Sequence, residues 1–370
     1  MNKVKLLPQD VISKIAAGEV IERPSSVVKE LAENAIDAGA TSIELVLQEG
    51  GKKLIRLKDN GHGIDRDDLE TIFLRHATSK INTADDLFDI HSLGFRGEAL
   101  YSVAAIADIA LTSKTKDDDA WHIHMRGGDK INLKPDALSS HGTHIDVNEL
   151  FFNTPARKKF LKSDTSELNQ VLNVFIPYCL LKNDIRFFLK NNEKTLIDVK
   201  PTDDRRSRVA QTLNLDAKNL LHAEHTFKEH DVTIELIIGN INVVRGRRDL
   251  QYIFVNDRPV DNKNITFHIN NVCRLIFPPN RFPAFSIYIN LPADNVDVNI
   301  HPTKREVKLK DEQIICTMIR NLTENLLMTA GQAKQAAVIE KEVSVSRPSS
   351  STDKSSTQQD TSFDALSLVY

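Results

Sequence analysis

The segment ELAENAIDAGA, from Glu30 to Ala40, predicts an amphipathic helix with two carboxylates and an amide along one stripe. The spacing of Glu30, Asn34 and Asp37 is i, i+4 and i+7, which puts all three side chains on one helical face. Carboxylate and amide oxygens gathered on one helical face can form a functional site. For this helix taken alone, a solvated polar face is the alternative, and it fits Glu33 of the segment and Lys29 just before it.

Length and composition indicate a soluble protein with two domains. The chain has 370 residues and a mass of 41.6 kDa, which exceeds one ordinary domain. Its net charge is −3, but 48 basic residues can still gather on one face, so nucleic-acid binding is not excluded. Three distant cysteines without a CxxC pair argue against a disulfide framework or a zinc site. No apolar run of about 18 residues occurs, which predicts a cytoplasmic protein that does not span a membrane.

The first part of the chain mixes strands and helices in the manner of an α+β fold. Strand-like runs at 42–47 and 53–58 flank a Gly50-Gly51 turn and predict a hairpin. A helix is expected from Asp67 to Arg75, and the long loop that follows at 76–98 is typical of a functional lid. Hairpins rather than repeated βαβ units predict a mostly antiparallel sheet with helices on one face. Further strands are expected at 108–114, 121–125, 143–147, 185–189 and 195–199.

A second, smaller domain is predicted at 203–330, after a first domain at 1–202. Its signals are a basic helix at 204–213, strands at 232–238 and 251–255, a helix at 263–273 and a final helix at 311–330. Residues 331–370 become rich in Ser, Thr, Gln and Asp, which predicts a flexible linker. A C-terminal dimerisation domain is expected to be absent from the chain.

Two glycine-rich segments offer ligand contacts. In Asp59-Asn60-Gly61-His62-Gly63 a carboxylate ends a strand and can accept a hydrogen bond from an exocyclic amine such as that of adenine. A plain hairpin turn is the alternative. The loop Gly94-Phe95-Arg96-Gly97 runs into a helix, so its backbone amides can bind phosphate, and an ordinary capped loop is its alternative. Gly142-Thr143 adds a hydroxyl at the start of a strand, a weak signal alone.

Taken together and in this order, these segments resemble the ATP site of the GHKL ATPases. That superfamily includes DNA gyrase B subunits, a heat-shock chaperone, sensor histidine kinases and the MutL mismatch-repair proteins. The resemblance implies a Bergerat-type α/β sandwich, followed by a smaller α/β transducer domain that is similar to a ribosomal protein. A type II topoisomerase ATPase subunit is the alternative within the superfamily.

Six longer blocks resemble the MutL family, and the resemblance runs from residue 1 to about 330 in the family's order and spacing. A topoisomerase subunit should lack SLGFRGEAL, FFNTPAR and HPTK, so these blocks favour MutL. The six are IAAGEVIERPSSVVKELAENAIDAGAT (Ile15 to Thr41), DNGHGI (Asp59 to Ile64), RHATSKI (Arg75 to Ile81), SLGFRGEAL (Ser92 to Leu100), FFNTPARKKFL (Phe151 to Leu161) and VDVNIHPTKREV (Val296 to Val307).

The family resemblance implies a role for each matching residue of an ATP site. Glu30 is the expected general base that activates the attacking water, and Asn34 is the expected ligand of Mg²⁺. Asp59 is expected to bind the adenine amine, with Gly63 and Thr143 beside it. The phosphates are expected to lie among Thr78, Lys80, Gly94, Phe95, Arg96 and Gly97.

Lys304, in the HPTK block of the second domain, is expected by resemblance to reach the γ-phosphate. ATP would then clasp the two domains together. A solvated strand-end lysine is the alternative for Lys304 alone, and Thr303 stands where the family commonly has Ala. ATP is expected to order the loop at 76–98, and the ordered loop to form part of a homodimer interface.

A local excess of basic residues predicts DNA binding. Seven Lys and Arg stand against three Asp between Arg245 and Arg281, which suits the phosphate backbone, although scattered surface arginines are the alternative. The resemblance implies that Lys263, where the family often has Arg, contacts DNA, and Arg247, Arg248 and Arg258 are further candidates. No base-reading motif is visible, so binding without sequence specificity is expected.

The function implied by the resemblance is that of a matchmaker in DNA mismatch repair, driven by Mg²⁺ and ATP in a bacterial cytoplasm at the nucleoid. Expected partners are DNA, a second copy of the chain, a MutS-type mismatch recognition protein, and a MutH-type endonuclease or a helicase. No DQHAxxE motif is present, so no endonuclease activity is expected of this chain. A DNA clamp whose nucleotide is only structural is a further alternative, against which intact Glu30 argues.

Three histidines invite a metal interpretation. His122 and His124 alternate on one face of an expected strand but have no third ligand nearby in sequence. We therefore expect them to be exposed strand residues, and no role is assigned to them or to His62.

Overall fold

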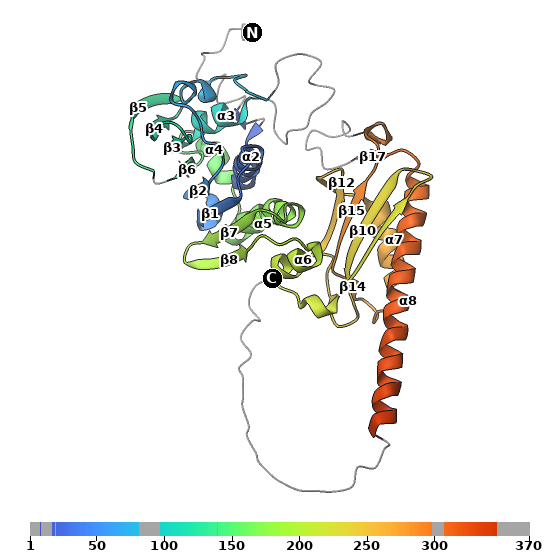
Figure 1. Ribbon diagram of the computed structural model, residues 1–370. Coiled ribbons are helices and arrows are strands. Elements are labelled where there is room, and N and C mark those ends of the chain that lie inside the picture. The colour runs from blue at the N-terminus through green and yellow to red at the C-terminus, as the bar shows by residue number, and fades with distance from the viewer. Residues whose placement is uncertain are drawn as a thin grey trace, which may run out of the picture.

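The computed structural model describes residues 8, 17, 18, 20–80, 97–138, 140–297 and 307–345, with side chains up to residue 329 in the last range. Four site candidates lie outside the described residues, and so do 81–96 of the expected lid and 346–370 of the expected linker. These four are Gly94, Phe95, Arg96 and Lys304. Figure 1 shows two bodies of sheet and helix, with α6 (Arg205–Leu213) lying between them.

An eight-stranded sheet forms the first body, in the order β5-β4-β3-β6-β2-β1-β7-β8. Neighbouring strands are antiparallel except β1 and β7, which run parallel. The predicted hairpin of the first two strands and the predicted mostly antiparallel sheet are thereby confirmed. The strands are β1 (Ser42–Gln48), β2 (Leu54–Asp59), β3 (Asp108–Lys114), β4 (Trp121–Arg126), β5 (Asp129–Pro135), β6 (Gly142–Asn148), β7 (Arg186–Asn191) and β8 (Lys194–Val199).

The strands of this sheet bury every second side chain beneath helices. In β1 the side chains of Ile43, Leu45 and Leu47 are all fully buried, while the residues between them are half-buried. This alternation is expected of a sheet that is covered on one face. Figure 1 shows the covering helices on one side of the sheet, namely α2 (Pro24–Asp37), α3 (Ala99–Ile106) and α5 (Asp164–Leu181).

Helix α2 lies with its apolar face in this core. Pro24 occupies its first turn, and Gly39, just past its end, has a φ of 70°, a left-handed conformation that suits glycine. Each of the larger buried side chains contributes about 1.5–3 kcal/mol through burial. Because that face is committed to the core, the polar stripe points away from it. The buried apolar residues of the helix are Val27, Val28, Leu31, Ala32 and Ala35.

The predicted helix from Asp67 to Arg75 is wrong. The segment forms two short 3₁₀ turns, η2 (Arg66–Asp68) and η3 (Thr71–Phe73). Only Leu69 and Phe73 of the segment are buried, so it lacks the apolar stripe that stabilises an α-helix against a core.

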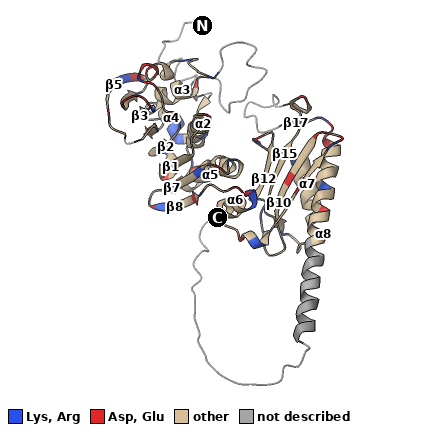
Figure 2. Ribbon diagram, viewed as in Figure 1, with Lys and Arg blue, Asp and Glu red and all other residues tan. Residues whose placement is uncertain are grey.

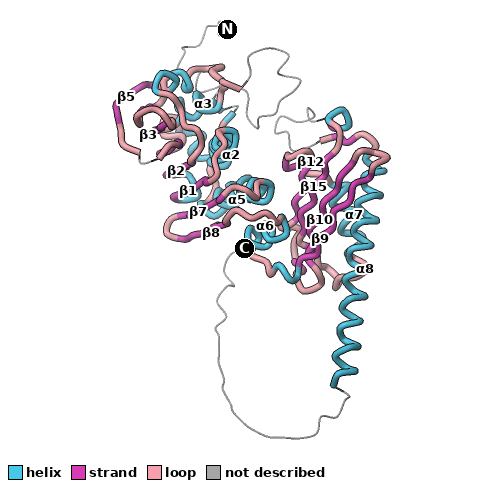
Figure 3. Tube along the Cα trace, in the orientation of Figure 1, coloured by secondary structure: helices cyan, strands magenta, loops and turns pink. Residues whose placement is uncertain are grey.

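A five-stranded sheet in the order β13-β12-β15-β10-β9 forms the second body, covered on one face by two helices (Figures 1 and 3). Two small two-stranded sheets flank it: β11 (Val244–Arg245) with β14 (Phe282–Pro283), and β16 (Val296–Asp297) with β17 (Lys308–Leu309). The main elements are β9 (Leu220–Phe227), β10 (Val232–Gly239), β12 (Gln251–Val255), β13 (Arg258–Val260), α7 (Lys263–Cys273), β15 (Phe285–Asn290) and α8 (Glu312–Val345).

The last helix extends further than the sequence predicts. Helix α8 continues to Val345, so the expected linker cannot begin at residue 331. The stretch after Gly331 contains many Ala, Gln, Lys and Glu, which are strong helix formers and prolong a helix that is already started. Within the described part of the chain, no helix has the length and apolar character needed to cross a membrane.

The two bodies share a hydrophobic core. Ile237, Phe254 and Tyr288 of the second sheet belong to the core of the first body, and the Tyr288 hydroxyl donates to the Leu180 carbonyl of α5 at 2.9 Å. Arg208 of α6 is fully buried and donates to four backbone carbonyls, which ties α6 to the end of α5 and the strands after it. Those carbonyls belong to Cys179, Lys182, Ile185 and Lys200.

Candidate functional site

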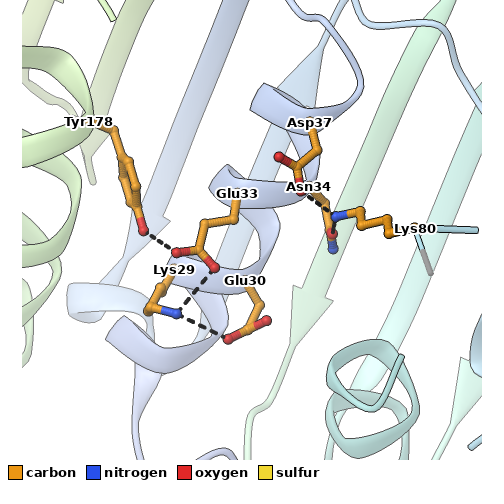
Figure 4. Close-up of polar contacts among 7 residues, drawn as sticks. All are labelled: Lys29, Glu30, Glu33, Asn34, Asp37, Lys80 and Tyr178. Carbon is orange, nitrogen blue, oxygen red and sulfur yellow. Dashed lines mark hydrogen bonds and ion pairs between the residues drawn. The ribbon is translucent and has the colours of Figure 1, made fainter. Parts of the chain in front are cut away.

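The polar stripe of α2 forms one side of the candidate site (Figure 4). Asn34 and Asp37 both accept hydrogen bonds from Lys80: its Nζ lies 2.9 Å from Asn34 Oδ1 and 2.5 Å from Asp37 Oδ2. Glu30 lies one turn before Asn34 with its side chain 28% exposed. Three predicted site residues, Glu30, Asn34 and Lys80, thus lie in one region of the structure. Asn34 and Lys80 are in contact although they are 46 positions apart in sequence.

These contacts test whether a metal ion suits the stripe. An amide oxygen and a carboxylate oxygen already hold a cation, the ammonium group of Lys80. Oxygen donors of this kind are the ligands that Mg²⁺ prefers, so the residues present fit the expected ion. Asp37, the third residue of the predicted stripe, is part of this cation-binding group.

The turn after β2 lies at the other end of α2. The backbone N–H of His62 donates to the Ala38 carbonyl at 3.0 Å, which ties the turn to the C-terminal end of the helix. Asp59 stands at the end of β2, opposite Thr143 of β6 in the strand register. Eight residues of helix separate Glu30 from Ala38, or about 12 Å. Asp59 and Glu30 are therefore placed to meet opposite ends of an elongated ligand.

Glycines are required here by the packing of the chain. A Cβ atom at Gly63, whose φ is 78°, would fall 2.1 Å from the Lys114 carbonyl oxygen. A Cβ at Gly97, with φ 59°, would fall 2.5 Å from the Ala77 carbonyl oxygen, next to Thr78. The atoms nearest to Gly63 are all backbone, so the path of the chain itself requires this glycine. Gly97 packs the described end of the glycine loop against the segment that carries Thr78 and Lys80.

Asp59 is a carboxylate in a largely buried position. Burial raises the pKa of its carboxyl to about 6, while the backbone amides of Gly61 and Thr143 and the nearby His62 act in the opposite direction. The Gly61 N–H donates to Asp59 Oδ1 at 2.9 Å. At neutral pH the group is an ionised acceptor in a partly desolvated position, which strengthens a hydrogen bond to an amine.

Ser113 of β3 joins the glycine turn to β6, and the sequence gave no signal for it. Its Oγ accepts from the Ile64 N–H at 2.9 Å, donates to the Gly142 carbonyl at 3.1 Å and lies 2.9 Å from Thr143 Oγ1. A lone serine in a strand is too common to be noticed. It acts here by fixing Thr143 beside the turn that bears Asp59.

Glu33 was also missed, because its spacing places it off the stripe. The residue is buried, with a relative exposure of 6%. Its carboxylate accepts from the Tyr178 hydroxyl of α5 at 2.6 Å and from Lys29 Nζ at 3.1 Å (Figure 4). Burial raises the pKa of Glu33, opposed mainly by the charge of Lys29. The alternative interpretation, in which this part of the helix is a solvated face, is therefore wrong for Glu33.

The histidines of β4 are not the exposed residues that the sequence predicts. His122 and His124 are half-buried on the strand and pair with Thr112 Oγ1 at 2.9 Å and Asp108 Oδ1 at 2.8 Å. Burial lowers the pKa of His122, which keeps it neutral near pH 7. No group of three or more His, Cys, Asp or Glu that could hold a metal ion occurs among the residues with described placement.

The four DNA-binding candidates separate into two groups in the second body. Arg247 and Arg248 come before β12 and are exposed, while Arg258 and Lys263 follow the opposite end of that strand. Helix α7 connects the two ends, since it begins at Lys263 and its Asn270 bonds Gln251 at the start of β12. In Figure 2, Lys and Arg occur in both bodies, interspersed with Asp and Glu. The candidates therefore do not form one compact patch.

Comparison with known proteins identifies the fold and the family. A family model described as "Histidine kinase-, DNA gyrase B-, and HSP90-like ATPase" matches residues 21–144, and a model described as "DNA mismatch repair protein, C-terminal domain" matches 211–328. The DNA mismatch repair protein MutL of Clostridium acetobutylicum is 40% identical over 319 residues, or 86% of this chain and 51% of that protein. The chain belongs to the MutL family. The topoisomerase alternative is thereby set aside.

Further relatives agree with this assignment. MutL of Endomicrobium trichonymphae is 40% identical over 361 residues, which cover 96% of this chain and 58% of the relative. The chain thus spans about half the length of the curated MutL proteins it matches.

Solved structures support the same fold. The N-terminal domain of a DNA repair protein superposes with a TM-score of 0.74 at 27% identity, over 87% of this chain and 99% of that one. The Aquifex aeolicus MutL ATPase domain complexed with ADP gives 0.61 at 25% identity, over 82% and 98%. The predicted α+β fold of the GHKL type is confirmed, and the first body of this MutL-family chain has the fold of the MutL ATPase domain.

Asp59→Asn should stabilise the protein at high pH only. The folded-state pKa of about 6 exceeds the value of 3.8 for a free Asp. The free energy of unfolding therefore falls as the pH rises from about 4 to about 6, because the unfolded chain ionises first. Removing the charge should raise the free energy of unfolding at pH 8 by on the order of 2 kcal/mol and change it little at pH 4. Urea denaturation at both pH values measures this.

Asp119→Asn, an exposed carboxylate between β3 and β4, is the matched control and should have no effect at either pH. An Asp59→Asn effect that is the same at pH 4 and pH 8 would show that its carboxyl is not strained by burial.

Proposed function

We propose that this chain binds ATP with Mg²⁺ along the polar stripe of α2 and hydrolyses the γ-phosphate bond. The proposal is carried by one observation: Asn34 and Asp37 hold the Lys80 ammonium one helical turn from the Glu30 carboxylate. A site that binds a cation beside a partly exposed carboxylate suits a metal-bound triphosphate. The metal ion, when bound, would neutralise charge that develops on the phosphates.

Glu30 is the proposed general base. Its closest described polar neighbour is Lys29, whose Nζ lies 3.5 Å from Oε1, so its carboxylate retains capacity to accept a proton from water. Asn34 is the proposed metal ligand through Oδ1. With Asn34 Oδ1 holding the ion, the Lys80 ammonium would be free to contact the phosphates, where Thr78 and Gly97 would also lie.

Asp59 is proposed to bind the adenine. Its ionised carboxylate accepts a hydrogen bond from the exocyclic amine, and Gly63 and Thr143 form the surrounding wall. Gly94, Phe95 and Arg96 of the glycine loop, together with Lys304 of the second domain, complete the phosphate end by family resemblance. We assign residues 1–202 to the ATPase domain and 203–330 to a transducer and DNA-binding domain.

We further propose that ATP binding drives formation of a homodimer, and that the dimer couples mismatch recognition to strand incision and unwinding. Its partners would be a MutS-type recognition protein, a MutH-type endonuclease or a helicase, and DNA bound without sequence preference. Membership of the MutL family supports these steps. The shared core at Tyr288 gives a physical route between nucleotide and DNA-binding domain.

Glu30→Ala should retain ATP binding and lose nearly all hydrolysis, by about 100-fold or more in kcat, because a general base supplies a factor of that order. Equilibrium nucleotide binding and steady-state phosphate release measure the two effects. Glu193→Ala, an exposed carboxylate in the turn between β7 and β8, is the control and should hydrolyse normally. Unchanged turnover in Glu30→Ala would remove Glu30 from the role of base.

Lys263→Glu should weaken DNA binding about tenfold at low salt and reduce the slope of log affinity against log salt by about one, because one phosphate contact is lost. Fluorescence anisotropy with duplex DNA at several salt concentrations measures both. Lys194→Glu on β8 is the control.

The double variant Arg247→Glu/Arg248→Glu tests the other end of β12. An affinity that falls only in that double variant would move the DNA surface to the β11–β14 end.

A further inference from the structure

Glu33, Tyr178 and Lys29 form a polar network behind the proposed base, in which Glu33 and Tyr178 are buried and Lys29 is partly exposed (Figure 4). The Tyr178 hydroxyl of α5 donates to Glu33 Oε1 at 2.6 Å, and Lys29 donates to Glu33 Oε2 at 3.1 Å. Both oxygens of a carboxylate that has a relative exposure of only 6% are therefore satisfied. A buried carboxylate without such partners is costly, so this arrangement fixes the geometry of all three groups.

The Lys29 ammonium is shared unequally between two carboxylates. Its Nζ lies 3.1 Å from Glu33 and 3.5 Å from Glu30. Lys29 and Glu33 are i, i+4 neighbours on the helix, whereas Lys29 and Glu30 are adjacent in sequence and do not naturally face each other. Glu33 is therefore the favoured partner, and it draws the ammonium away from Glu30.

The charge on Lys29 is maintained. Burial lowers the pKa of its ammonium, but Glu33 and Glu30 together outweigh burial and raise it. A permanently charged ammonium within reach of a general base competes with water for the oxygens of that base.

We propose that Glu33 and Tyr178 are positioning residues for ATP hydrolysis: they hold the Lys29 ammonium so that the Glu30 carboxylate keeps an oxygen free for the attacking water. This inference rests on the proposed role of Glu30 as the base. Neither Glu33 nor Tyr178 touches the proposed water. They act through Lys29, and Tyr178 brings α5 into the arrangement from 145 positions along the chain.

The inference makes a specific prediction for paired variants. Glu33→Gln keeps the shape of the side chain but removes its charge, so the Lys29 ammonium should move onto Glu30. We expect kcat for ATP hydrolysis to fall about tenfold, while the dissociation constant of ATP stays within about twofold. Adding Lys29→Met removes the competing ammonium, so the double variant should recover to within about twofold of Lys29→Met alone.

Tyr178→Phe provides a second test that does not depend on the folding of Glu33→Gln. It removes only the hydroxyl, and it should lower kcat in the same direction, with recovery when Lys29→Met is added. Glu324→Gln, in the exposed i, i+4 pair with Arg320 on α8, is the matched control and should leave kcat unchanged.

The outcomes separate this inference from the proposed function. An equal loss of kcat in the presence and absence of Lys29 would overturn the inference, because Glu33 would then not act through the ammonium. A parallel loss of ATP affinity in both Glu33→Gln and Tyr178→Phe would overturn it as well, in favour of a purely structural role. If Glu30→Ala itself hydrolyses ATP at the normal rate, the proposed base fails, and the inference fails with it.

Discussion

The packing of α2 against the sheet and against α5 is the constraint on which the remaining site geometry depends. One face of the helix must be apolar enough to hold it in the core, and Val28 and Leu31 are buried for that purpose. The other face must present charged and polar groups close to that core. The two most buried carboxylates of this helix are paired: Glu33 with Tyr178 and Lys29, and Asp37 with Lys80. Pairing of this kind is what permits charge beside an apolar interior.

Helix α5 connects the candidate site to the second body. Tyr178 on α5 donates to Glu33 beneath the stripe, and two residues later the Leu180 carbonyl accepts from Tyr288 of the second sheet. The same sheet contributes Phe254 to the core of the first body. A small shift of α2 on α5 is therefore felt at the contact between the bodies, because packed interiors resist local change.

Sequence patterns predicted much of this architecture, and local spacing explains why. The stripe of Glu30, Asn34 and Asp37 follows from helical periodicity, and the β1–β2 hairpin follows from alternation around a glycine turn. The family resemblance supplied the fold type, which comparison confirms.

Contacts between distant segments could not be predicted in this way. The burial of Glu33 depends on a tyrosine from another helix, and the division of the basic candidates depends on the path of β12 and α7. Helix α5 was missed because its C-terminal half is buried almost all round and lacks a clear stripe. The extent of α8 was underestimated because polar helix formers resemble a linker in composition.

The most direct test of the ATP site is a crystal structure of the chain with Mg²⁺ and a non-hydrolysable ATP analogue. The account predicts Asn34 Oδ1 about 2.1 Å from the metal ion, a typical Mg²⁺–oxygen distance, with the Lys80 ammonium moved off that oxygen. It also predicts that the adenine amine donates to Asp59. A metal ion bound elsewhere while Lys80 still pairs with Asn34, or an adenine away from Asp59, would contradict the account.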